Sequence, residues 1–138
     1  MANILETARN AGTFNTLLKA IEAVGLEEEL SQAGPLTVFA PVDGAFDQLP
    51  EGTLEDLFND IPQLKKILTY HVVFGDVRSE DLVDIDEART MEGSVLAVDT
   101  SHGYKINQAK VVQPDVMTDN GVIHIIDSVL MPAMMMAK

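Results

Sequence analysis

The chain of 138 residues has the size of one domain, and its 46% apolar and 22% charged residues exclude a disordered polar polymer. Nine Lys and Arg residues stand against 22 Asp and Glu residues, and the formal net charge of −13 disfavours nucleic acid and anionic membrane surfaces as partners. The absence of cysteine excludes disulfides, thiolate metal sites and a cysteine nucleophile. We expect one domain over residues 1–138, with a core at about 4–132 and a tail at 133–138.

The first helix that the residue spacing predicts begins after Thr13 and ends at Gly25. Thr13 is a suitable N-cap, and glycine readily adopts the left-handed conformation that ends many helices. The apolar residues between them recur at helical intervals: Phe14, Leu17, Leu18, Ile21 and Val24. The composition of residues 36–40 then predicts a short buried strand, which Pro41 ends.

Three more helices are predicted before Tyr70. Asp43 is placed to cap a short helix, Thr53 with Asp56 three residues later opens the next, and the third begins at Ile61. In chain order, their apolar residues are Ala45, Phe46 and Leu49, then Leu54, Leu57 and Phe58, then Ile61, Leu64, Ile67 and Leu68.

After Tyr70 the pattern changes to strands, with one helical turn at Ser79–Val83. The predicted strands are residues 71–74, 89–91, 94–99, 104–107, 110–116 and 122–130. Asn120-Gly121 is a strong hairpin signal before the last of them. Helices gathered early and strands gathered late predict an α+β fold. We expect its core to include Phe39, Phe46, Leu68, Val72, Ile123 and Ile125.

Three segments, in this order and spacing, resemble the signatures of the fasciclin domain family. They are Gly34–Phe46 (GPLTVFAPVDGAF), Leu68–Val73 (LTYHVV) and Asn120–Pro132 (NGVIHIIDSVLMP). The resemblance implies a wedge with β-sandwich-like, antiparallel-rich sheets in the second half and helices packed around them. It also implies a non-catalytic adhesion or matrix-binding module that meets a surface protein, a receptor or a glycan, and that needs no cofactor.

The same resemblance implies an extracellular, cell-surface or periplasmic location. Residues Met1–Glu6 contain no basic region followed by an apolar run, so we expect no secretory signal in this chain, and a cytoplasmic location is the alternative. The most apolar stretch, residues 122–137, is interrupted by polar residues and falls short of the ~20 residues that span a bilayer. We therefore expect no membrane insertion.

The candidate partner-binding residues also come from the resemblance. Gln113–Met117 (QPDVM) is similar to the Glu-Pro-Asp-Ile-Met adhesion segment of animal fasciclin domains, with Pro114, Asp115 and Met117 matching, and Gln113 and Val116 replacing Glu and Ile. The structural alternative is a strand end, where Pro114 removes a ladder donor and Asp115 begins a bend.

Tyr70 and His71 resemble a second adhesion element of the family, and packing explains the two residues equally well. We predict that His71 and His124 are buried, hydrogen-bonded core residues rather than metal ligands or catalytic groups.

Two other classes of function are kept as alternatives. A hydrolase needs a nucleophile, a base and an orienting acid, and none of the usual motifs is present, although the three histidines and several serines allow a triad without a motif. Thioether sulfurs favour Cu(I), so a copper-handling tail would use the methionines near the C-terminus: Met131, Met134, Met135 and Met136.

Overall fold

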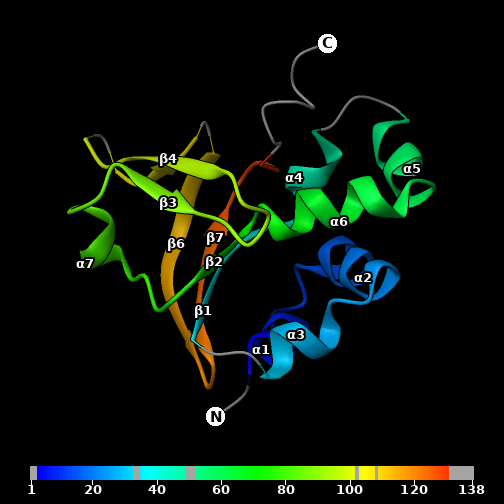
Figure 1. Ribbon diagram of the computed structural model, residues 1–138, viewed down its shortest axis with the longest axis horizontal. Helices are drawn as coiled ribbons and strands as arrows, with labels where there is room; N and C mark the ends of the chain where they lie inside the picture. Colours follow the sequence, from blue (N-terminus) through cyan, green and yellow to red (C-terminus); the bar gives the residue numbers. More distant parts are fainter. Residues whose placement is uncertain (1–2, 33–34, 49–51, 102, 108, 131–138) are drawn as a thin grey trace.

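The computed structural model describes residues 3–32, 35–48, 52–101, 103–107 and 109–130. In chain order the elements are α1 (Ile4–Ala11), α2 (Asn15–Val24), α3 (Glu27–Gln32), β1 (Leu36–Pro41), α4 (Asp43–Asp47), α5 (Thr53–Phe58), α6 (Ile61–Thr69), β2 (Val72–Phe74), α7 (Ser79–Leu82), β3 (Glu87–Arg89), β4 (Val95–Asp99), β5 (Lys105–Ile106), β6 (Ala109–Thr118) and β7 (Gly121–Ile126). Figure 1 shows α1 to α6 gathered beside the strands, with α7 apart from them. The α+β prediction is confirmed.

Seven strands of the described chain form a sheet in the order β2-β1-β7-β6-β5-β4-β3. The β1–β7 pair is parallel and all other pairs are antiparallel. The two ends of this order also meet, because Val73 forms an antiparallel bridge with Thr90 and the Met91 N–H donates to the Val72 carbonyl over 2.7 Å. The strands therefore curl back on themselves, and β3 and β4 form a second β layer.

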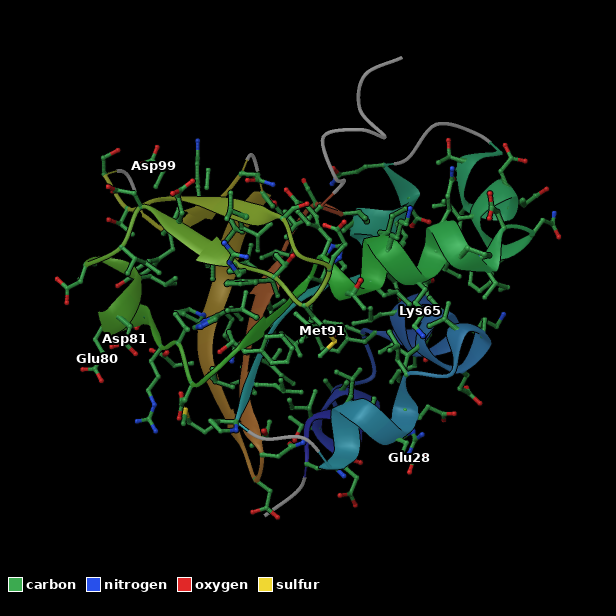
Figure 2. The ribbon with its side chains drawn as sticks, in the orientation of Figure 1. Glu28, Lys65, Glu80, Asp81, Met91 and Asp99 are labelled. Atoms are coloured by element: carbon green, nitrogen blue, oxygen red, sulfur yellow. The ribbon has the colours of Figure 1, made fainter. Side chains whose placement is uncertain are left out.

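Two hydrophobic cores lie on opposite faces of β1. Alternate side chains of a strand point to opposite faces, so Leu36, Val38 and Ala40 enter the core shared with the helices, whereas Phe39 enters the core between the two β layers. Every residue of β1 is consequently buried. Met91 is half-buried against the helix-side core, and Figure 2 shows it between the strands and the helices.

Several boundaries differ from the sequence predictions. The helices α1 and α3 were not predicted, α2 has Phe14 rather than Thr13 at its N-cap position, and α5 begins at Thr53 after Gly52 instead of being capped by Thr53. The predicted strand 122–130 ends at Ile126. Of the predicted core residues, Ile125 is only half-buried and the other five are buried. Leu49 lies outside the described residues.

Asp43 caps a different helix from the one predicted. It is the first residue of α4, and its carboxylate instead accepts the Thr16 N–H of α2 over 2.9 Å and an amide N–H of Asn15 over 3.1 Å. The hydrogen bond from Thr16 is the main reason that the pKa of Asp43 lies below its ordinary 3.8. The end of β1 thus delivers a carboxylate to the positive N-terminus of α2.

Replacing Asp43 with alanine is expected to lower the free energy of unfolding by about 1 kcal/mol, because the first turn of α2 loses its side-chain acceptor. Asp47→Ala, at an exposed position of the same short helix, is the control. Urea unfolding measures both variants. Equal stability of the two variants would show that the contact with Thr16 does not stabilise α2.

The β6–β7 hairpin is tied to the helical layer by Asn120. The Asn120 side chain accepts the Ile4 N–H over 3.0 Å and donates to the Leu30 carbonyl over 2.7 Å, while its carbonyl accepts the Leu36 N–H over 3.0 Å. The predicted hairpin is confirmed. Its two turn residues are Asp119 and Asn120, however, and the glycine that follows is already in β7. Within the described ranges, no helix is long and apolar enough to cross a membrane.

Candidate functional site: the Asp115 segment

The Asp115 segment, residues 113–117, is an irregular part of β6. The pairing register of β6 with β7 shifts between Val111 and Gln113 and again between Gln113 and Val116. Asp115 has a φ of 59°, a left-handed conformation that residues other than glycine seldom adopt, although aspartate adopts it more often than most. The segment is therefore a bulge within the strand, and not the strand end considered as the structural alternative.

The bulge presents Asp115 at the surface. Asp115 is exposed, as are Gln113 and Met117, whereas Pro114 and Val116 are half-buried. Val116 packs against the helix-side core. The branched side chain of Val116 thus anchors the segment, and the Asp115 carboxylate is its exposed charged group.

The Asp115 carboxylate is held by Ser79 at the start of α7. It accepts the Ser79 N–H over 2.8 Å and a short hydrogen bond from the Ser79 hydroxyl. Partial burial by itself raises the pKa of Asp115, but the bonds from Ser79, together with His124 and Arg78, bring it below the ordinary 3.8. Asp115 is therefore ionised at neutral pH.

The surface around Asp115 carries further charge. The Arg78 guanidinium donates to both carboxylate oxygens of Asp76 over 3.2 Å. Figure 2 shows Glu80 and Asp81 on the outer side of α7, away from the strands. Ser79 and Arg78 had not been proposed as site residues. The predicted helical turn at Ser79–Val83 was the available signal, but the contact joins residues that are 36 positions apart.

His124 lies beneath the segment. Its ring is 0% exposed and stacks on Phe39 with 5.4 Å between the ring centroids. Nδ1 accepts the Asp115 N–H over 3.2 Å, so the ring proton is on Nε2, which donates to the Val77 carbonyl over 2.7 Å. Burial lowers the pKa of His124 below 6.5, so the ring is neutral at pH 7.

Tyr70 and His71 are buried at the end of α6, with 5% and 2% of their surface exposed. The Tyr70 hydroxyl donates to the Val95 carbonyl over 3.3 Å and accepts an Asn107 amide N–H over 3.1 Å. His71 is bonded through both ring nitrogens, which, with the burial of His124, confirms the prediction of two hydrogen-bonded core histidines. A surface partner does not reach Tyr70 or His71 in this conformation, so the exposed candidate is the Asp115 segment.

Ser79, His124 and Asp115 have the residue types of a hydrolytic triad but not its connections. A triad requires the imidazole to accept the proton of the nucleophile and the carboxylate to orient the imidazole. Here the hydroxyl donates to the carboxylate, and both ring nitrogens are bonded to backbone groups. In the part of the chain that the structure describes, no three His, Asp or Glu residues are grouped to hold a metal ion. The methionines proposed for copper lie outside it.

The fold is that of a FAS1 domain. The solved domain pair of the insect cell adhesion molecule fasciclin I matches with a TM-score of 0.62 at 20% sequence identity, over 83% of this chain and 45% of that chain. The family model of the fasciclin domain matches residues 12–132. The chain belongs to the fasciclin domain family.

Three relatives illustrate how this domain is used in chains of different length. The uncharacterized protein sll1735 of Synechocystis sp. is 45% identical over 131 residues, which are 95% of this chain and 98% of that protein. Immunogenic protein MPB70 of Mycobacterium bovis is 35% identical over 127 residues, 91% of this chain and 61% of the relative. The transforming growth factor-beta-induced protein ig-h3 of Sus scrofa is 32% identical over 133 residues, 96% of this chain and 20% of the relative.

Proposed function

We propose that this protein is a non-catalytic adhesion module of the fasciclin type, comprising one domain over residues 1–138, which binds a surface protein, a receptor or a glycan outside the cytoplasm. Support comes from membership of the family and from the match to an insect cell adhesion molecule. The Ser79 hydroxyl donates to Asp115 and the His124 ring donates to the Val77 carbonyl. The two side chains are therefore not joined as a nucleophile and its base, which agrees with a binding role. Under this proposal neither hydrolysis nor copper handling is its activity.

We place the partner contact at the Asp115 segment. The observation that carries this proposal is an exposed, ionised carboxylate on a bulge that is held in place from two sides. Such a carboxylate can ligate a cation held by a receptor or pair with a basic group, and fixing it before binding lowers the entropic cost of association. Pro114 and Val116 would shape the segment. For the buried Tyr70 and His71 we propose only an indirect part, through packing.

Asp115→Asn separates adhesion from folding better than Asp115→Ala does. Alanine removes the acceptor of the Ser79 N–H, so it is expected to cost about 1 kcal/mol of stability as well as attachment. Asparagine keeps an oxygen acceptor and removes the charge, so attachment should fall severalfold while the unfolding midpoint in urea stays close to that of the wild type.

The assay is attachment of protein-coated beads to whole cells of the source organism, with Asp119→Asn as the control because Asp119 is an exposed acid in the adjacent turn. The Asp119→Asn control changes the net charge by the same amount as Asp115→Asn and leaves the bulge unaltered. If beads carrying the Asp115 and Asp119 variants attach equally well, the partner contact lies elsewhere on the domain.

A further inference from the structure

The clasp loop, residues 75–79, crosses one face of the sheet and is fastened to it by side chains of three strands. From β1, the Thr37 hydroxyl donates to the Gly75 carbonyl over 2.7 Å and accepts the Val77 N–H over 2.8 Å. From β7, His124 donates to the Val77 carbonyl, and from β6, Asp115 accepts both bonds from Ser79. The clasp loop and the Asp115 segment therefore meet at His124.

His124 supports Asp115 only in one protonation state. The Asp115 backbone is held in a left-handed conformation, which the surrounding structure must maintain because it is sterically disfavoured for this residue. Its N–H donates to the lone pair on Nδ1 of His124. A proton on Nδ1 would occupy this lone pair and point a second donor at the Asp115 N–H.

We propose that neutral His124 is the positioning residue of the Asp115 segment, and that protonation of its Nδ1 releases the bulge and with it the adhesive surface. The release itself is a property of the domain. Its effect on attachment rests on the proposed function.

The groups that face His124, together with its burial, determine the direction in which its pKa is shifted. Asp115 on β6 and Asp76 in the clasp loop both favour the charged ring, while β1 presents the apolar Phe39. Arg78 is bonded to Asp76 and acts on Asp115 from the same loop. Burial outweighs the bond to the Val77 carbonyl and the two carboxylates, and it lowers the pKa of His124 below 6.5, so the bulge is held at neutral pH and is released on acidification below that value.

Two substitutions of His124 test its bond to the Asp115 N–H and its bond to the Val77 carbonyl separately. The amide oxygen of His124→Asn can take the place of Nδ1 and accept the Asp115 N–H without titrating, whereas the amide of His124→Gln reaches toward Val77 and leaves the Asp115 N–H without its acceptor. The readout is amide hydrogen exchange by NMR, with the amides of β1 as the internal reference for global opening.

In the wild type, exchange at Asp115 relative to β1 is expected to rise about tenfold as His124 is protonated, which is the size of effect that losing one hydrogen bond gives. His124→Asn should remain protected throughout this range, and His124→Gln should exchange fast even at neutral pH. Both variants are first checked for a native NMR spectrum. Protection at Asp115 that is unchanged while the His124 ring titrates would overturn the proposal, and so would unfolding of the domain before the ring titrates.

Bead attachment at neutral and acidic pH then tests the link to adhesion. Attachment should fall with acidification for the wild type and stay level for His124→Asn. If exchange follows the expected pattern and attachment does not, the positioning role stands and the adhesive role of the segment fails.

Discussion

Gly121→Ala is expected to abolish the native fold, or to lower the free energy of unfolding by more than about 4 kcal/mol. A Cβ at Gly121 would lie 1.9 Å from the Leu36 carbonyl oxygen, 2.8 Å from the Leu36 carbonyl carbon and 2.9 Å from its nitrogen. All three are backbone atoms at the start of the parallel β1–β7 pair, which runs from Leu36 and Gly121 to Pro41 and Ile126. Relief of the clash would require the strands to separate, and both cores include side chains of these strands.

The matched control is Gly44→Ala. Gly44 is an exposed residue of α4, and a Cβ there would meet nothing within 4 Å. Alanine at this helical position is expected to be neutral or to stabilise by up to about 1 kcal/mol. Circular dichroism and urea unfolding compare the two variants. A Gly121→Ala protein within about 1 kcal/mol of the wild type would mean that the two strands do not approach as closely as described.

Gly121 also shows how a correct prediction can rest on the wrong cause. The Asn-Gly pair predicted a hairpin because glycine tolerates a positive φ in tight turns. The hairpin is present, but Gly121 does not have a positive φ and belongs to β7. Glycine is needed at position 121 because β1 lies too close for a side chain, and the sequence alone does not reveal which strand is the neighbour.

The elements found from sequence are those whose signal is local. The helical spacing from Leu17 to Val24 and from Ile61 to Leu68 predicted α2 and α6, because each helix buries one continuous face. The helix α3 was missed because Leu30 is the one apolar residue among its six, EEELSQ, and a single apolar residue shows no helical spacing, although it is buried in the helix-side core.

The candidate site was only partly predictable because the contacts that form it are not local in the sequence. The resemblance indicated Asp115, and the burial of His124 followed from its place in an apolar strand. The contacts that hold the site are distant in sequence, since Asp115 binds Ser79 36 positions away and His124 binds Val77 47 positions away. Asp43 failed as a local cap for the same reason, as its partner Thr16 is 27 positions distant.

Acidification from pH 6.5 toward pH 4 is expected to lower the free energy of unfolding by on the order of 3 kcal/mol through His71. His71 donates from Nδ1 to the Ile67 carbonyl over 2.7 Å, and its Nε2 accepts the Leu130 N–H over 2.9 Å. The buried ring must therefore be neutral. Burial lowers its pKa from 6.5 to about 4, and the bond to Ile67 offsets part of that effect.

The direction follows from proton uptake. Between pH 6.5 and 4 the unfolded chain binds a proton at His71 and the folded protein does not, so each step toward acid favours unfolding. His124 acts in the same direction because its pKa is also lowered. Asp43 and Asp115, whose pKa values lie below 3.8, lose their contribution only in stronger acid.

His71→Asn isolates the contribution of this ring. The asparagine amide can still donate to the Ile67 carbonyl, an acceptor at the C-terminal end of α6, but it does not titrate and leaves the Leu130 N–H without its partner. The variant should be less stable than the wild type at pH 7 and should show a much flatter dependence between pH 6.5 and 4. Urea unfolding at several pH values measures both curves. Parallel curves would assign the acid sensitivity to another group, and the slope that His71→Asn retains is the share expected from His124.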